Sequence, residues 1–181
     1  MHTRHGGGGK VIVPPLHKKI WKEFYLTEIF SIIQRGKRLK IVDHIEGDKP
    51  YISSTAENNG VDNFIGNEEN ACQIENCLTL ANSGSVGKAF YHPYNFVASD
   101  HVTNLKDPSL NKYAYIFISS IISNTFPQKY GFNHEINSKR IKNEKIKLPV
   151  NENGEPDWTY MEDYIRQQEN LLLQKYFDKK F

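Results

Sequence analysis

The chain has 181 residues, of which 38% are hydrophobic and 24% are charged, and its formal net charge is +2. A chain of this size and composition forms one folded domain with a working core, which excludes two separate domains and an intrinsically disordered protein. No apolar run in the sequence approaches the roughly 20 residues that a membrane-spanning helix needs, so we expect a soluble cytoplasmic protein.

The first 16 residues are expected to be a flexible or artificial leader. They contain His2, Arg4 and His5, followed by glycines at 6–9, and they lack the apolar stretch of a signal peptide. The folded domain is therefore expected at 17–156, with a separate terminal helix at 157–181.

Positive charge is concentrated in two segments of the chain. Arg35, Lys37, Arg38 and Lys40 form one cluster, residues 139–147 form another, and the segments 43–75 and 152–169 are mostly acidic. Such segregation indicates one positive face, although either cluster taken singly is equally consistent with a solvated edge.

The expected elements begin with an aromatic segment at 20–26, a strand or short helix with Trp21 and Phe24 in the core. A basic turn at 34–38 and a short strand at 50–55 follow, and Asn59-Gly60 then predicts a hairpin because both residues accept a positive φ. Runs of β-branched and aromatic residues predict further strands at 77–80, 88–91, 96–98 and 101–105, in a compact, curved sheet.

A strand, tight turn and strand are expected at 79–91, with small polar residues at the tip. Gly84 and Gly87 permit a positive φ and so free backbone N–H groups for a ligand, while Lys88 and neighbouring Asn and Ser side chains suit phosphates or base edges. The alternative is an ordinary hairpin that binds nothing.

Neither a metal nor a nucleotide cofactor is expected. Cys72 and Cys77 are the only cysteines, and their spacing matches no common zinc pair, which favours two reduced thiols. Gly87-Lys88 does not complete a Walker phosphate loop, because Asn82 stands where its first glycine belongs and Ala89 where its hydroxyl belongs.

The last third of the chain predicts a buried helix at 111–126 with Pro127 beyond its end, an exposed aromatic loop at 129–133 and a strand at 146–150. A terminal helix begins at Asp157, a good N-cap. Its apolar stripe is wide enough to bind a partner as well as its own domain, and we expect the partner-binding residues to be Met161, Ile165, Gln168, Leu172 and Tyr176.

Several segments, in this order, resemble a known family. They are Trp21–Phe30 with Gly36, Pro50–Ser53, Asn58–Val61, Asn82–Gly87, Phe90-Tyr91, Phe96–Ala98, Tyr130–Phe132, Ile146–Val150, Pro156–Trp158 and Met161–Ile165. From Trp21 to its end the chain resembles a target recognition domain of the specificity subunits of type I restriction-modification systems and related restriction-modification enzymes. The resemblance implies an α+β fold, with a small curved mixed or antiparallel sheet, a buried helix and a C-terminal assembly helix.

The resemblance also implies a protein of host defence that reads double-stranded DNA without cutting or methylating it. Family members normally carry two such domains joined by long helices, and they position an adenine methyltransferase subunit and a restriction subunit. This chain has one domain and one helix. It therefore corresponds to a half-subunit that forms a homodimer through the C-terminal helix, to a fragment, or to a domain that docks directly on a methyltransferase.

Sequence reading by such a domain requires cations for phosphates and hydroxyl or amide groups for base edges. The expected DNA-binding residues are Arg35, Lys37, Arg38, Ser53, Ser54, Asn58, Asn59, Asn82, Ser83, Ser85, Lys88, Lys129, Tyr130, Asn133, Lys139 and Arg140.

Two other classes of function compete with DNA reading. An adenine methyltransferase is disfavoured because the residues after Pro93, Tyr94-Asn95-Phe96, have the wrong order for its active-site motif, and a nuclease because Glu144 and Lys147 are one residue too far apart. A protein-interaction domain that does not bind DNA, for instance an inhibitor of a restriction-modification system, remains the alternative.

Overall fold

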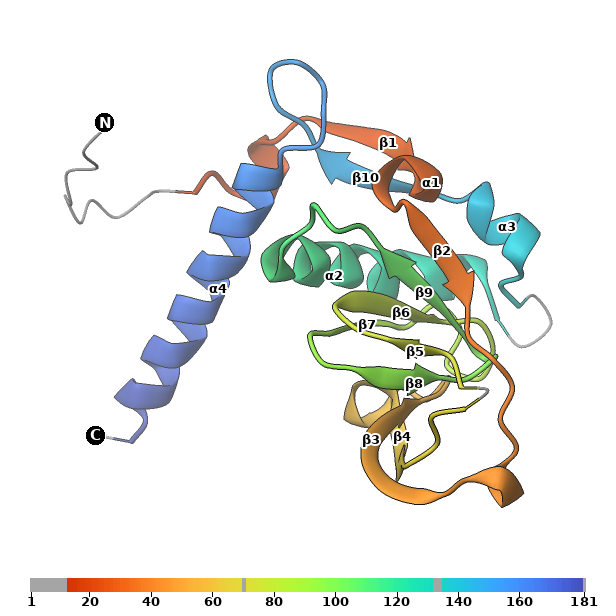
Figure 1. Cartoon of the computed structure of the whole chain (residues 1–181). Coiled ribbons are helices and arrows are strands. Elements are labelled where there is room, and N and C mark those ends of the chain that lie inside the picture. Colours follow the sequence, from red (N-terminus) through yellow and green to blue (C-terminus); the bar gives the residue numbers. More distant parts are fainter. Residues whose placement is uncertain (1–12, 70, 132–134, 181) are drawn as a thin grey trace, which may run out of the picture.

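The computed structural model describes residues 13–69, 71–131 and 135–180 (Figure 1). The expected leader therefore lies mostly outside the described residues, as does the candidate Asn133. Residues 13–16, assigned to that leader, contact the domain: the Tyr160 hydroxyl donates to the Pro14 carbonyl at 2.8 Å, and the Trp21 indole donates to the Leu16 carbonyl at 3.1 Å.

The strands within the described residues form three sheets. The first pairs β1 (Trp21–Tyr25) with β10 (Lys145–Pro149), which are antiparallel. The second has the order β2-β9-β6-β7, and comprises β2 (Ile32–Arg35), β9 (Val102–Lys106), β6 (Cys77–Ala81) and β7 (Ala89–His92). The third has the order β4-β3-β8-β5, and comprises β4 (Val61–Ile65), β3 (Glu46–Ile52), β8 (Phe96–Ala98) and β5 (Gln73–Ile74). The fold is thus α+β with mixed pairing, as expected, but the strands are divided among more sheets than the one anticipated.

The central helix α2 (Lys112–Lys129) organises the main core. Asn111 caps it by accepting from the amides of Tyr113 and Ala114. Its buried face, which includes Tyr115, Ile118 and Phe126, packs on the second sheet and on α4 (Trp158–Asp178). Pro127 lies inside the last turn of α2 and not beyond its end, contrary to expectation.

Helix α4 packs on α2 only through its first half and then leaves the body of the molecule, as Figure 1 shows. Asp157 caps it, as predicted, by accepting from the Tyr160 amide at 3.0 Å. Met161 and Ile165, expected to bind a partner, are instead buried in the domain's own core. Gln168 is half-buried, and Leu172 and Tyr176 are 67% and 53% exposed. No helix within the described residues is long and apolar enough to cross a membrane.

Short helices lie before and between the strands. They are η1 (Leu16–Lys18), α1 (Leu26–Ile29), η2 (Ile41–Asp43), η3 (Glu57–Gly60) and α3 (Ser138–Lys142). The two predicted hairpins are confirmed. Strands β6 and β7 pair antiparallel around the 82–88 tip, and β3 pairs with β4 around a turn in which Asn58, Asn59 and Gly60 all have a positive φ.

A buried histidine on β7, in the second sheet, contacts a threonine on the neighbouring strand β6. His92 is inaccessible to solvent, and its Nε2 lies 2.9 Å from the Thr79 hydroxyl. Burial lowers the pKa of His92 to about 4, from an ordinary value of 6.5. The folded protein therefore holds His92 neutral under conditions in which the unfolded chain would protonate it.

We predict that stability depends on pH through this residue. The pKa of His92 is lower in the folded protein than in the unfolded chain. Its contribution to the free energy of unfolding is therefore complete above pH 6.5 and is lost as the pH falls towards 4. The loss should reach about 3 kcal/mol of the free energy of unfolding. Urea denaturation at several pH values should show this slope in the wild type and a shallower one in His92→Gln. An unchanged slope in His92→Gln would contradict the assignment.

Candidate nucleic-acid interface

The tip of the β6–β7 hairpin is tied to two other loops through Asn82. The backbone N–H of Asn82 donates to the backbone carbonyl of His101 at 2.8 Å. The backbone N–H of Ile136 donates to the backbone carbonyl of Asn82 at 3.0 Å. The side chain is also used, since its Oδ1 accepts from the Thr103 hydroxyl at 2.9 Å. Asn82 is only 1% exposed, so it joins the hairpin tip to two other loops and does not present its side-chain amide at the surface.

Two further contacts fix the rest of this tip. The Ser85 amide donates to the Ser54 carbonyl at 2.9 Å, which links the tip to the end of β3. The Ser83 hydroxyl lies 2.9 Å from Nδ1 of His101 and is itself buried. Gly84 has φ 55°, and a side chain there would collide with Ser54, so glycine is required where these loops meet.

The first basic cluster lies against the loop that follows β8. The Gly36 amide donates to the Val102 carbonyl and the Lys37 amide to the Ala98 carbonyl, both at 3.0 Å. The Arg35 guanidinium donates to the Asp100 carbonyl. A Cβ atom at Gly36 would overlap the carbonyl oxygens of Ala98 and Ser99. The expected turn at 34–38 is therefore partly a strand, β2, that runs into a tightly packed loop.

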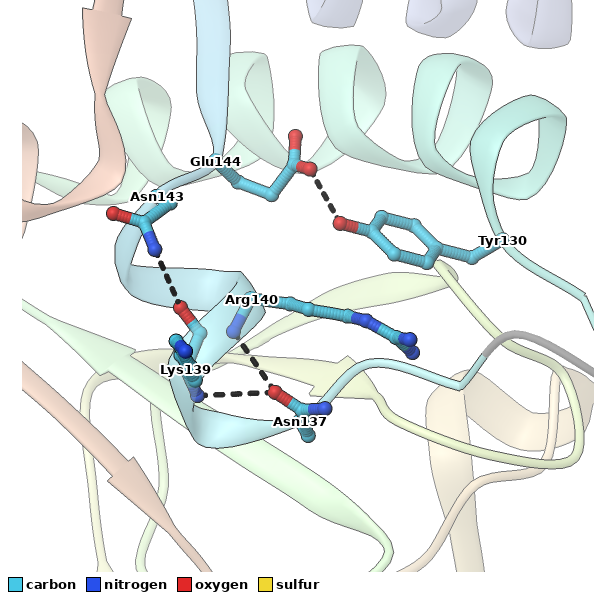
Figure 2. Close-up of a pocket in the computed structure, with 6 residues that line it drawn as sticks. All are labelled: Tyr130, Asn137, Lys139, Arg140, Asn143 and Glu144. Carbon is cyan, nitrogen blue, oxygen red and sulfur yellow. Dashed lines mark hydrogen bonds between the residues drawn. The ribbon is translucent and has the colours of Figure 1, made fainter.

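The first part of the second basic cluster, Lys139, Arg140 and Lys142, lies on α3, a helix that the sequence did not predict, and Lys145 and Lys147 lie on β10. Asn137 caps this helix by accepting from the amides of Lys139 and Arg140 at 3.1 and 2.9 Å (Figure 2). Arg140 donates in turn to the Glu135 carbonyl. Because Ile136 is bonded to Asn82, α3 is held beside the hairpin tip.

A pocket of about 540 Å³ opens between α3, the end of α2 and the start of β10. Figure 2 shows Tyr130 and Glu144 on one side of it, with their side chains hydrogen-bonded, and α3 with Asn137 on the other. Tyr130 is buried, although the sequence predicted an exposed aromatic loop. Lys129 pairs with the Glu144 carboxylate at 3.0 Å.

The one carboxylate that lines this pocket, Glu144, is paired within the protein. Burial would raise the pKa of Glu144, but hydrogen bonds from Tyr130 and Lys129 outweigh burial and lower it, so the carboxylate stays ionised. Burial and the same carboxylate raise the pKa of Tyr130. Lys129 and Tyr130, both expected DNA contacts, therefore serve this internal network.

These hydrogen bonds bring five segments together, and we call them the loop surface: residues 35–42, 53–54, 82–88, 99–101 and 135–140. A groove of about 510 Å³ lies between 38–42, Ser53 and His101, which makes 38–42 continuous with the rest. The loop surface carries the cations Arg35, Lys37, Arg38, Lys40, Lys88, Lys139 and Arg140, against the carboxylates Asp100 and Glu135. Most of the candidate residues are thereby gathered on one positive region.

The other expected DNA-binding residues differ in their exposure to solvent. Ser53, Ser54, Ser85 and Lys88 are half-buried, and Arg35, Lys37, Arg38 and Lys139 are exposed. Asn58 and Asn59 are exposed at the β3–β4 turn, beside the loop surface and not within it. Sequence reasoning missed His101 and Asn137. The contacts that join His101 to the hairpin tip are with Ser83 and Asn82, 18 and 19 residues away along the chain, so no local pattern marks it. Asn137, as a helix cap two residues before Lys139, had a recognisable signal.

Among the residues that the structure describes, no group of three or more His, Cys, Asp and Glu side chains is placed to hold a metal ion.

Comparisons with known proteins place these features in a family. Residues 18–175 match the type I restriction modification DNA specificity domain. The chain is 36% identical, over 162 residues, to S.BcgI of Heyndrickxia coagulans, the specificity subunit of a type II restriction enzyme. That match covers 88% of this chain and 47% of the relative, so the chain spans about half the length of its curated relative.

Solved structures share the fold. The S subunit of a type I restriction-modification system from M. genitalium matches with a TM-score of 0.60 at 18% identity, over 91% of this chain and 42% of that one. The HsdS subunit from Thermoanaerobacter tengcongensis matches with a TM-score of 0.59 at 16% identity, over 94% of this chain and 42% of that one.

We predict that the close approach at Gly36 is a packing requirement. Gly36→Ala should lower the free energy of unfolding by about 1 to 3 kcal/mol, because the added methyl group meets backbone carbonyls that cannot move aside cheaply. Gly131→Ala is the matched control, since a Cβ atom there meets nothing within 4 Å. Urea denaturation compares the two variants. Equal stabilities would show that residues 35–37 do not pack as described.

Proposed function

Because the chain belongs to the type I restriction-modification DNA specificity family, we propose that its loop surface reads double-stranded DNA on behalf of other subunits. The domain would supply sequence discrimination, and an adenine methyltransferase subunit and a restriction subunit would supply the chemistry. This target recognition domain would thus act as the specificity component of a restriction-modification complex.

The observation that carries the proposal is the convergence of distant loops on one positive region. The segments that carry the cations are joined to the hairpin tip by backbone hydrogen bonds, residues 36–37 through residues 98–102 and α3 through Ile136. Duplex DNA needs such an arrangement, because cations neutralise phosphates while fixed polar groups between them meet base edges.

Different residues of this region suit phosphate contacts and base-edge contacts. The exposed cations Arg35, Arg38 and Lys139 suit phosphate contacts, which supply affinity without sequence preference. The hydroxyls of Ser53 and Ser54 and the amides of Asn58 and Asn59 suit base edges, to which they can both donate and accept. Asn82 and Ser83 support the surface from beneath.

We further propose that the outer half of α4 binds a partner helix. Leu171, Leu172, Leu173, Tyr176 and Phe177 are each about half to two-thirds exposed, which is a wide apolar surface for a helix in water. A second copy of this chain, or a helix of a methyltransferase subunit, would cover it.

We predict that charge removal on the loop surface weakens DNA binding. Arg38→Gln and Lys139→Gln should each lower affinity for duplex DNA about three- to tenfold and reduce the slope of log affinity against log salt by about 1, since each removes one phosphate contact. Lys175→Gln, on exposed α4, should leave both quantities unchanged. Fluorescence anisotropy over a salt series measures them.

The opposite pattern would contradict the DNA-reading role. If all three variants bound duplex DNA like the wild type, or if the wild type bound every duplex equally in the presence of its partner subunits, the chain would act through protein contacts alone. The alternative of a restriction-modification inhibitor would then be favoured.

We predict that assembly depends on the exposed half of α4. The double variant Leu172→Asp/Tyr176→Asp should lose association with its partner, because it places charge in an apolar contact. It should retain the wild-type melting temperature, since neither residue touches the core. Light scattering of the chain alone and with a methyltransferase subunit measures the assembled mass. Assembly at wild-type strength would rule out this surface as the interface.

A further inference from the structure

Two large apolar side chains are exposed to solvent at one end of the loop surface. Ile41 is 82% exposed and Val42 is 87% exposed, more than any other large hydrophobic residue among those described. They are the first two residues of η2, and the segment before them is Arg38-Leu39-Lys40. Asp43 is the one carboxylate between residues 38 and 45.

This apolar tip is held rigidly. Within η2, the Asp43 amide donates to the Lys40 carbonyl at 2.9 Å and the His44 amide to the Ile41 carbonyl at 3.1 Å. Both ends of the turn are also fixed to the third sheet. On the side before the tip, the Tyr51 hydroxyl donates to the Leu39 carbonyl at 3.4 Å, and Leu39 packs beside Tyr51 in a small core.

The side after the tip is fixed by two more residues. The His44 ring stands edge-on to the Tyr51 ring with centroids 4.7 Å apart. The buried Asn67 side chain donates to the Asp43 carbonyl at 2.9 Å and accepts from the Ile45 amide at 2.9 Å. A turn braced on both sides keeps Ile41 and Val42 from folding back onto the domain, so their exposure is a property of the fold.

The tip is continuous with the proposed DNA surface. Ile41 and Val42 line the same groove as Ser53 and His101, together with the carboxylates Asp62 and Asp100. A duplex that reached Ser53 and His101 would therefore pass beside the tip. Arg38, in the same groove, would lie against the phosphates next to the point of contact.

We propose that Ile41 and Val42 form a wedge that inserts at one base step of the bound duplex, unstacks it and bends the DNA. The proposal rests on the DNA-reading function proposed above. Apolar side chains flanked by cations suit this task, because the wedge replaces stacked base contacts while the cations hold the displaced phosphates. The energy needed to open the step depends on its sequence, so the wedge also adds discrimination without a base-edge hydrogen bond.

The experiment uses the full chain and a duplex selected by it from a random pool. The base analogue 2-aminopurine is placed in turn at successive positions of the duplex, where its fluorescence rises when it is unstacked. Fluorophores at the two duplex ends report bending by energy transfer. Wild-type protein should raise the 2-aminopurine signal at one step and shorten the end-to-end distance.

The double variant Ile41→Ser/Val42→Ser removes the wedge and leaves the cations. It should bind the duplex about tenfold more weakly and abolish both signals, and a mismatch at the affected step should restore most of its affinity because the unstacking cost is then already met. Both side chains are exposed, so folding should be unaffected. Ile20→Ser, which removes another side chain that is 72% exposed, should behave like the wild type.

Each outcome decides between the hypotheses. If the double variant bound and bent DNA like the wild type while Arg38→Gln still weakened binding, the wedge would be wrong and DNA reading would stand. If the double variant lost association with a methyltransferase subunit but kept both DNA signals, the tip would be a protein contact. If the wild type selected no duplex, both proposals would fail together.

Discussion

The candidate interface depends on backbone hydrogen bonds between segments that are distant in the sequence. Asn82 joins the hairpin tip to His101 and Ile136, Ser85 joins it to Ser54, and Gly36 joins the first basic cluster to Val102. These bonds replace contacts with water by contacts between loops, so the loops hold one arrangement before any ligand arrives. A surface ordered in advance loses less conformational entropy on binding, which favours discrimination between similar ligands.

The same constraint explains which polar side chains remain for a ligand. Asn82, Ser83 and Tyr130 make the internal bonds that fix the loops, and Lys129 compensates the Glu144 carboxylate. Their neighbours Arg38, Lys139 and Ser53 lie on the surface that results. Helix α2 packs on α4 and on strands β6 and β7, so it lies in the core that separates the proposed DNA surface from the proposed assembly surface. A change on the outer half of α4 is therefore separated from the loops by a well-packed core.

Much of the fold could be predicted because its signals are local. Both hairpins, the central helix and the Asp157 cap depend on residues a few positions apart, and the structure has all of them. The failures involve partners far along the chain. Residues 34–35 resemble a basic turn but pair with β9, and Tyr130 resembles a surface aromatic until Glu144 is placed beside it.

For the candidate site, the sequence named segments that the fold gathers together, but it did not show which of their side chains are exposed. It located the basic clusters and the hairpin tip, but it could not show that Asn82 points inward or that His101 lies next to Ser83, because these contacts cross between strands. The apolar tip at Ile41 and Val42 was also invisible, since hydrophobic residues in a sequence are expected to be buried and only the fold shows these two in water.

The most direct test of the account is the structure, by electron cryomicroscopy, of the chain assembled with a methyltransferase subunit on a duplex that the complex modifies. The account predicts that the duplex lies along the loop surface, with Arg38 and Lys139 at phosphates and Ser53 at a base edge, while the outer half of α4 contacts protein. A duplex bound to another face of the domain, with the loop surface left in solvent, would contradict it.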